Sequence, residues 1–252
     1  MSNYSDISKF VQGTNASKSP IIPISAQSNL NLDALIYSIE NEIKTPEHDD
    51  KKLPVMHVLR SFDINKPGSK IANIKGGVIG GSLTEGQFSI GDEIEIKPGL
   101  LNEKKKNYEP LITEIVSLGT GAGTVDNVKP GGLVAIGTKL DPNLTRGDSF
   151  IGSVIGKPGS LPENSDTAKL KISLFDSAVG SSNNEKITPV NMGEMLRLNI
   201  GTAPIPGKVS KAKGSEIEVT LRRPTCLFEK SNVAISRRIA DRWRLIGAGI
   251  IG

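Results

Sequence analysis

The sequence predicts a mainly β protein in which two antiparallel β-barrels follow a short α/β segment. Three observations lead to this fold class. Beyond residue 52 the apolar residues recur with a period of two, strand candidates are short and regularly spaced, and glycine and proline turns separate them. Because aromatic residues make up only 4% of the chain and hydrophobic residues 37%, we expect the two cores to be aliphatic.

The first 45 residues differ from the rest of the chain. Residues 6–11 have helical character, residues 21–24 form a short apolar strand, and residues 31–43 carry apolar side chains at helical spacing after an asparagine cap. An apolar strand between two helices is typical of a covered parallel sheet, but the sequence offers no neighbouring parallel strand. Residues 1–45 are therefore interpreted as the end of an α/β domain, and the charged residues 46–52 as a linker.

The first barrel is expected over residues 53–160. Turns are predicted at Lys66-Pro67-Gly68, at Lys97-Pro98-Gly99 and at Lys129-Pro130-Gly131-Gly132. The strands predicted between these turns are residues 55–64, 77–83, 93–97, 111–118, 133–138 and 150–155.

The second barrel is expected over residues 161–252. Residues 216–221 alternate cleanly between apolar and polar side chains, so one face of that strand is buried and the other is wet. The predicted strands are residues 168–175, 192–202, 207–212, 216–221, 232–237 and 243–251.

The end of the second barrel carries the strongest functional signal. Residues 235–250 place four arginines and the only tryptophan between two apolar runs, which predicts a strand, a basic turn and a closing strand with close backbone packing at its glycines. Guanidinium groups stay charged and donate paired hydrogen bonds to phosphate or carboxylate, so RNA backbone is the expected ligand. The alternative is a solvated rim of arginines around Trp243 as a buried core residue. The arginines concerned are Arg237, Arg238, Arg242 and Arg244.

Positive charge is concentrated in the same part of the chain. Residues 197–244 hold eleven basic residues and four acidic ones, whereas the net charge of the whole chain is +4. The rest of the chain is therefore slightly acidic. A basic C-terminal segment in an otherwise nearly neutral chain indicates a local surface that binds a polyanion.

Most chemistry-bearing residues argue against an active site. The single cysteine, Cys226, excludes an internal disulfide and a multi-cysteine zinc site, and we expect a buried structural thiol rather than a reactive one. The two histidines, His48 in the linker and His57 in a strand, have no partner at ligand spacing. Glu93 and Glu95 share a strand face and are expected to form a surface stripe. No catalytic and no metal-binding residue is predicted.

The glycine-rich segments do not make a nucleotide loop. Residues 152–158 have three residues between their glycines instead of four, and Pro158 stands where a serine or threonine must hold magnesium. Residues 75–81 are dense in glycine, but strands flank them and no helix begins there to stabilise a phosphate. Bends in a barrel strand explain those glycines as well as close approach of a ligand does.

Nothing in the sequence points to a membrane. No stretch approaches the roughly 18 uninterrupted apolar residues of a membrane span, and residues 1–6 lack the regions of a signal peptide. We therefore expect a cytoplasmic protein without a membrane partner.

Several blocks of the sequence resemble one family of translational GTPases. Ile22-Pro23-Ile24-Ser25-Ala26-Gln27 resembles the last guanine-binding motif of these proteins. The downstream blocks are similar to the gamma subunit of eukaryotic and archaeal translation initiation factor two, and elongation factor Tu lacks the Arg-Ser-Phe-Asp and Trp-Arg-Leu-Ile-Gly blocks among them. The downstream blocks are residues 60–68, 75–83, 90–99, 131–142 and 236–247.

The resemblance implies a fold and a function. The barrels would be domains two and three of the elongation-factor-Tu type, and the preceding residues a remnant of the GTPase domain. The family, with alpha and beta subunits and with GTP and magnesium, carries methionyl initiator tRNA to the small ribosomal subunit. The residues implied in tRNA acceptor-end binding are Gly76, Gly77, Gly80 and Gly81, and those in a guanine-binding remnant are Ser25, Ala26 and Gln27.

The chain also departs from the family pattern. It has no nucleotide loop, no Asp-x-x-Gly, no Asn-Lys-x-Asp and none of the zinc-knuckle cysteines. Bound GTP and catalysis are therefore not expected from this chain alone, and whether the natural protein is an enzyme stays open. Two alternatives remain: a fragment of a Tu-like or selenocysteine-specific elongation factor, and a barrel scaffold without a role in RNA binding.

Overall fold

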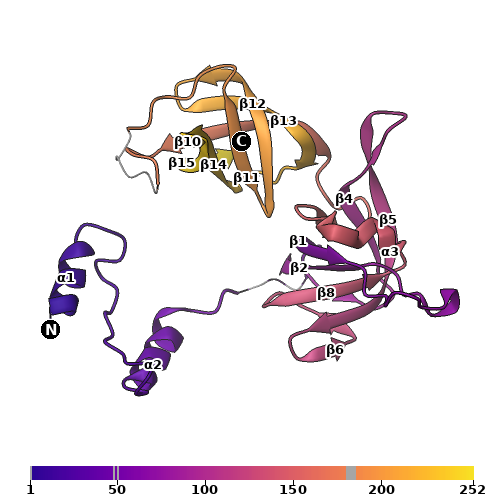
Figure 1. The fold of residues 1–252 in the computed structure, drawn as a ribbon, viewed down its shortest axis with the longest axis horizontal. Coiled ribbons are helices and arrows are strands. Elements are labelled where there is room, and N and C mark those ends of the chain that lie inside the picture. Colours follow the sequence, from indigo (N-terminus) through magenta and orange to yellow (C-terminus); the bar gives the residue numbers. More distant parts are fainter. Residues whose placement is uncertain (1, 48, 50, 180–185) are drawn as a thin grey trace. The chain divides into compact units, whose positions relative to one another are not determined.

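The computed structural model describes residues 2–47, 49, 51–179 and 186–252, and His48 lies outside them. The chain forms two compact units, Met1–Glu47 and His48–Gly252. The first unit holds helices and the second holds two β-barrels (Figure 1).

The first unit contains helix α1 (Ser2–Phe10) and helix α2 (Leu32–Glu42). The strand predicted over residues 21–24 is wrong: these residues belong to no strand, and the nearest β pairing in the described structure is an isolated bridge between Ser25 and Leu30. An extended segment needs a neighbouring strand for its backbone groups, and the described part of this unit supplies none. Asn31 is the N-cap residue of α2, but its side chain makes no capping hydrogen bond; its amide nitrogen donates to the Pro23 carbonyl at 3.0 Å.

The first barrel is closed by antiparallel pairings in the order β4-β9-β1-β2-β8-β5, with β4 paired to β5. β6 (Gly123–Val125) extends this sheet from β5, and β3 (Phe88–Ser89) pairs with β7 (Asn127–Val128). The barrel strands are β1 (Val55–Phe62), β2 (Val78–Glu85), β4 (Glu93–Asn102), β5 (Asn107–Thr120), β8 (Leu133–Thr138) and β9 (Val154–Gly156).

Short helical turns connect strands of this barrel. The 3-10 turn η1 (Ile71–Asn73) lies between β1 and β2. Helix α3 (Pro142–Thr145) and the 3-10 turn η2 (Arg146–Asp148) lie between β8 and β9. Asp141 caps α3 by accepting a hydrogen bond from the Asn143 backbone.

The turn predicted at Lys97-Pro98-Gly99 is wrong, because these residues lie inside β4. The pairing with β5 shifts there, from Ile96 opposite Leu111 to Leu100 opposite Glu109, which makes the segment a bulge. Gly99 has φ of 87°, and a Cβ at this position would overlap the Glu109 carbonyl. Proline and glycine therefore mark a bend within one strand rather than its end.

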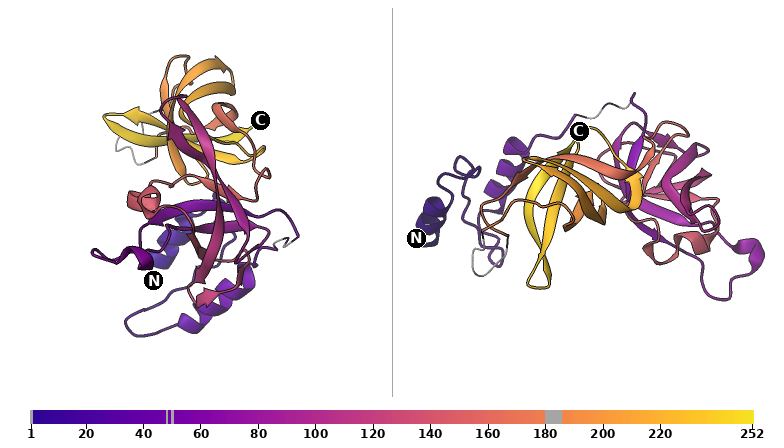
Figure 2. Two further views of the ribbon diagram at one scale, coloured as in Figure 1. Left: turned by 90° about the vertical axis from the view of Figure 1, so that its right-hand side faces the viewer. Right: turned by 90° about the horizontal axis from the view of Figure 1, so that it is seen from above.

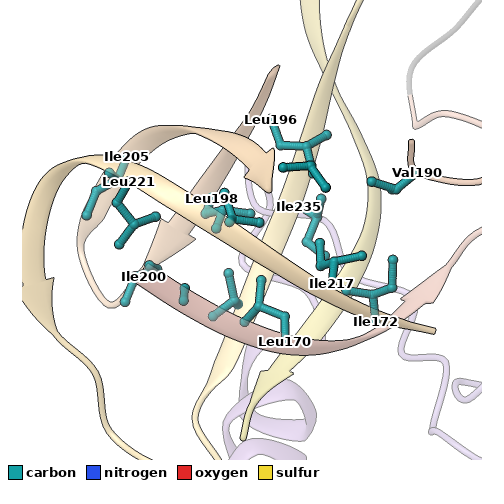
Figure 3. Packing of buried hydrophobic residues seen from close by; sticks show 14 of the residues in the cluster. Leu170, Ile172, Val190, Leu196, Leu198, Ile200, Ile205, Ile217, Leu221 and Ile235 are labelled. Atoms are coloured by element: carbon teal, nitrogen blue, oxygen red, sulfur yellow. The ribbon is translucent and has the colours of Figure 1, made fainter. Parts of the chain in front are cut away.

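The second barrel closes in the order β10-β13-β12-β11-β14-β15, and β15 pairs back with β10. Its core is aliphatic, as Figure 3 shows for side chains such as Leu198, Ile217 and Ile235. In both views of Figure 2 the β14–β15 hairpin projects as a yellow ribbon. The strands are β10 (Asn164–Leu174), β11 (Met195–Ile200), β12 (Ala203–Lys213), β13 (Glu216–Cys226), β14 (Asn232–Ile239) and β15 (Arg242–Ile251).

Candidate nucleic-acid interface

A groove of about 580 Å³ lies on the first barrel. Strands β1, β2 and β8 and the turn between β5 and β6 line it, with Gly80 and Gly81 at the β2 side. Its other contributors are mainly apolar or small residues. They are Leu59, Arg60, Phe62, Gly119, Thr120, Gly121, Gly123, Thr124, Leu133, Val134 and Ala135.

The structure separates the four predicted glycines into two pairs. Gly76 and Gly77 do not line this groove. An added Cβ at Gly76 would overlap the Thr138 carbonyl, and one at Gly77 would overlap the Thr145 side chain. Glycine is needed at these two positions because neighbouring residues pack directly against the backbone. The geometry of Gly76 and Gly77 therefore does not support their predicted role in binding the tRNA end.

Gly80 and Gly81 both reach the groove, but only Gly80 leaves room for a side chain. A Cβ at Gly80 would lie 3.7 Å from the Arg60 Cβ, whereas one at Gly81 would overlap the His57 carbonyl. A Cβ at Gly80 therefore meets its neighbours only at ordinary van der Waals distances, so a side chain there can occupy part of the groove.

Arg60 is the one cation among the groove residues. Its Nε donates to the two carboxylate oxygens of Asp148 at 2.9 and 3.2 Å, and the Ser61 backbone donates to the same carboxylate. The hydrogen bond from Arg60 holds the pKa of Asp148 below its usual range. Asp148 therefore fixes the direction of the guanidinium at the rim of the groove.

The β14–β15 hairpin has the predicted strand, basic turn and closing strand. Its two-residue loop consists of Ala240 and Asp241, which have φ of 45° and 63°. Positive φ at both positions is typical of the type I′ turn that joins adjacent antiparallel strands. In the middle of β15, a Cβ at Gly247 would overlap the Ser173 carbonyl, so the expected close backbone packing is present.

The four predicted arginines do not form one surface. Arg237 has only 14% of its side chain exposed and forms an ion pair with Glu194. It also donates to the Thr188 carbonyl at 2.9 Å and to the Pro189 carbonyl at 3.2 Å. Its guanidinium is therefore engaged within the barrel, which removes Arg237 from the set of residues available to RNA.

The other three arginines remain on the hairpin. Arg238 is mostly exposed and forms an ion pair at 3.1 Å with Asp241, itself exposed. Arg242 is exposed and Arg244 is half-buried. Exposed ion pairs contribute little energy, so Arg238 can exchange its partner for a phosphate.

The expectation that Trp243 is a buried core residue is wrong. Trp243 is half-buried and lies outside the aliphatic core cluster. Its ring packs under the Arg197 guanidinium, whose central carbon is 5.3 Å from the ring centroid. The inner surface of this barrel is filled by aliphatic side chains, so the indole lies towards the hairpin end instead.

The residues predicted to form a guanine-binding remnant lie in a small turn in the first unit. Ser25 and Leu30 exchange backbone hydrogen bonds at 3.2 and 3.0 Å, and the Asn29 N–H donates to the Ala26 carbonyl at 3.4 Å. Ala26 and Gln27 are exposed. The turn could offer contacts to a base, but the described residues of this unit hold no loop that could cradle a triphosphate.

A buried cluster around Lys97 was not predicted. Glu95 is buried rather than part of a surface stripe, because the Gly159 N–H donates to it at 3.1 Å and the Lys97 ammonium lies 3.9 Å away. Lys97 also donates to the Leu161 and Pro162 carbonyls at 3.3 Å. The sequence signal that could have located this cluster is Lys97 directly before Pro98-Gly99 within an apolar run. The same pattern also predicts a turn, which is why the cluster was not predicted.

Cys226 lies near this cluster and is buried as expected. It packs with Val154 and Leu161. Burial raises the pKa of the Cys226 thiol to about 11. The thiol therefore stays protonated at neutral pH, which fits a structural role.

His57 is the histidine within the described residues. Its ring meets the Phe228 ring edge to face at 6.0 Å, and burial lowers the pKa of its imidazole. Among residues 2–47, 49, 51–179 and 186–252, no group of three or more His, Cys, Asp or Glu side chains could hold a metal ion. The helices of the described chain are too short and too polar to cross a membrane.

The fold places the chain in a class. A bacterial selenocysteine-specific elongation factor has a similar structure, with a TM-score of 0.69 and 18% identity over 98% of this chain and 36% of that one. This likeness concerns the fold alone. The two closed antiparallel barrels of this chain therefore have the fold found in that elongation factor.

The sequence comparisons then define the family. The family described as "Initiation factor eIF2 gamma, C terminal" matches residues 166–251. The translation initiation factor 2 gamma subunits of Archaeoglobus fulgidus and Thermococcus onnurineus are 49% and 50% identical to this chain over 100% and 98% of its length. The chain belongs to the gamma-subunit family of translation initiation factor 2 and corresponds to its C-terminal part. It spans 59% and 61% of the length of these two relatives.

Proposed function

We propose that this chain supplies the tRNA-binding and subunit-binding barrels of an initiation factor two gamma subunit. In this role it helps deliver methionyl initiator tRNA to the small ribosomal subunit as part of a GTP-dependent heterotrimer with alpha and beta subunits. The observation that carries the proposal is the identity of about half of all residues to gamma subunits over the whole chain.

The groove of the first barrel is the proposed site for the acceptor end of the tRNA. Gly80 leaves the β2 backbone open on that face, so a terminal adenosine and its ester could approach closely. The methionyl side chain would meet the apolar residues of the same groove. The Arg60 guanidinium, held by Asp148, is placed to meet a phosphate at the rim.

The hairpin is the proposed contact with RNA backbone. Arg238, Arg242 and Arg244 present positive charge on a segment that projects from the second barrel (Figure 2). Such contacts to phosphate add affinity without base preference. The RNA would be tRNA or ribosomal RNA.

GTP and magnesium belong to the family, and the residues of this chain do not fit them. Binding of a triphosphate needs a lysine-bearing backbone cradle and magnesium ligands. Ser25, Ala26 and Gln27 lie in a small turn in which Ala26 and Gln27 are exposed, and the described residues include no carboxylate cluster suited to a metal. No step of the proposed function therefore depends on nucleotide bound to this chain alone.

The proposal is tested by substitution in the groove. This chain is joined to the N-terminal part of the Archaeoglobus fulgidus gamma subunit, and binding of methionyl initiator tRNA is measured by filter retention with GTP present. Gly80→Val should weaken binding by about tenfold or more, because the new side chain would occupy part of the groove where the β2 backbone is now open. Gly132→Val is the control, since Gly132 is exposed with open space around it and does not line the groove.

The same assay separates the alternatives. Equal affinity of Gly80→Val and the unsubstituted protein would reject the groove as the tRNA site. Equal affinity for initiator and elongator aminoacyl-tRNAs would favour an elongation factor. Absence of any tRNA binding in this assay, together with failure to retain the alpha subunit in a separate pull-down, would favour a scaffold.

A further inference from the structure

A second groove, of about 700 Å³, lies on the outer face of the second barrel. It crosses strands β11, β12 and β13 and includes the turn before β11. Neither the hairpin arginines nor the residues of the first groove line it. The lining residues are Met192, Gly193, Met195, Lys208, Val209, Ser210, Thr220, Leu221 and Arg222.

Two methionines give the groove an apolar part. Met192 is 75% exposed and Met195 is 39% exposed, which is unusual for large apolar side chains placed close together. The turn that carries Met192 is fixed, because the Gly193 N–H donates to the Val209 carbonyl at 2.8 Å and the Val209 N–H donates to the Glu194 carbonyl at 2.9 Å. Flexible thioether side chains on a fixed backbone can adapt to an inserted apolar group.

Two cations flank this apolar part. Met195, Lys208 and Thr220 form a row across three paired strands. Lys208 and Arg222 form no ion pair with any described residue. The adjacent carboxylates are already engaged, since Glu194 pairs with Arg237 and Glu218 pairs with Lys211 at 3.0 Å. The groove therefore has a positive charge that no neighbouring acid neutralises.

The barrel architecture limits how a ligand can bind here. All strands of the second barrel are paired on both sides in a closed order, so no free strand edge is available for an added strand. Recognition has to use side chains. Nucleotide sites usually offer aromatic rings for base stacking, and none of the lining residues is aromatic. Exposed methionines beside unpaired cations fit a protein segment better than RNA.

We propose that this groove docks an acidic segment of a partner protein. A large apolar side chain of that segment would pack on Met192 and Met195, while flanking carboxylates would pair with Lys208 and Arg222. The apolar contact supplies affinity, and the two cations select for acidic neighbours and set the direction of the segment.

The test uses short, fluorescently labelled acidic peptides with one central leucine, methionine or phenylalanine. Fluorescence anisotropy measures their binding to the whole 252-residue chain. Matching peptides with a central serine should bind about tenfold more weakly, because serine has no apolar side chain to pack on the methionines. Met195→Glu and Lys208→Glu should each weaken binding of the apolar peptides by about tenfold or more.

Lys213→Glu is the matched control. Lys213 is exposed on the same strand, β12, outside this groove, and the substitution changes the charge by the same amount as Lys208→Glu. It should leave peptide affinity unchanged. Thermal unfolding of each variant checks that the barrel stays folded, which is expected because the substituted side chains lie on the outer face.

Several outcomes would overturn the proposal. Absence of binding by all peptides, equal affinity of the serine peptides, or equal effects of Lys208→Glu and Lys213→Glu would each reject it. A single-stranded oligonucleotide that displaces the peptide and binds more tightly would instead assign the groove to RNA.

Discussion

Lys97 is a charged residue with only 3% of its side chain exposed. Its ammonium group is held by two backbone carbonyls and by the carboxylates of Glu95 and Glu163. Burying such a charge is costly unless every donor finds an acceptor. The cluster joins β4 to the segment that enters the second barrel, so the residue links consecutive parts of the second unit.

We predict that Lys97→Ala lowers the free energy of unfolding by about 3–5 kcal/mol, because it leaves the Glu95 carboxylate buried without its cation. Urea denaturation followed by circular dichroism measures this change. Lys213→Ala, which removes an exposed lysine, should change it by less than about 0.5 kcal/mol. A similar small effect of Lys97→Ala would show that water replaces the ammonium group.

The candidate site could be predicted only in part at this scale. The sequence located the glycine-rich strand, but it could not distinguish Gly76 and Gly77, which accommodate neighbouring chain, from Gly80, which faces open space. It also grouped Arg237 with the other arginines, because its partner Glu194 is distant in the sequence. A residue pattern gives the type of side chain. Whether that side chain is free to bind a ligand depends on the residues that the fold places next to it.

At the scale of elements, most barrel strands followed from alternation and turn signals, and the fold class is confirmed. Of the strand predicted at residues 150–155, only residues 154–155 lie in β9. The errors share a cause. Lys97-Pro98-Gly99 is a bulge because β5 continues alongside it, and residues 21–24 form no strand because they lack a neighbour. The two-residue strands β3 and β7 carry too few residues to show any period. Strands depend on pairing partners that a local pattern does not contain.

The β14–β15 hairpin gives a prediction at this scale. Replacing Arg238 and Arg242 together by alanine should lower the salt slope of affinity for initiator tRNA or a ribosomal RNA fragment by about one unit for each phosphate that the protein no longer neutralises. Sequence preference should stay unchanged, because these arginines would bind the RNA backbone and not the bases. Binding measured at several salt concentrations, with Lys213→Ala as control, checks this.

The fold should survive these two changes because both side chains are exposed. Thermal unfolding of the double variant and of the unsubstituted chain checks this expectation. If the salt slope and the RNA affinity equal those of the unsubstituted chain, Arg238 and Arg242 form a solvated rim and do not contact RNA. Arg237→Ala is unsuitable for this purpose, since it breaks the internal contacts with Glu194 and Thr188.

At the scale of the whole molecule, we predict that this chain alone neither binds GTP tightly nor hydrolyses it. The residues predicted to contact guanine, Ser25, Ala26 and Gln27, lie in a small turn, and the described residues include no lysine-bearing cradle for the phosphates. Titration with fluorescent GTP measures affinity, and the chimaera with the Archaeoglobus fulgidus N-terminal part is the positive control. Micromolar affinity of the isolated chain would contradict the prediction.

The closure of the second barrel has a consequence for its synthesis. Its first strand pairs with its last, so Leu170 lies opposite Ile251. During translation the residues of β10 leave the ribosome long before those of β15, and until then one side of β10 has no partner. Bringing β10 and β15 together closes a long loop, and only the pairing of the completed sheet offsets the entropy cost of that closure. The barrel therefore cannot reach its native state on a nascent chain until its final strand has emerged, and any earlier compact state leaves β10 open to wrong pairing.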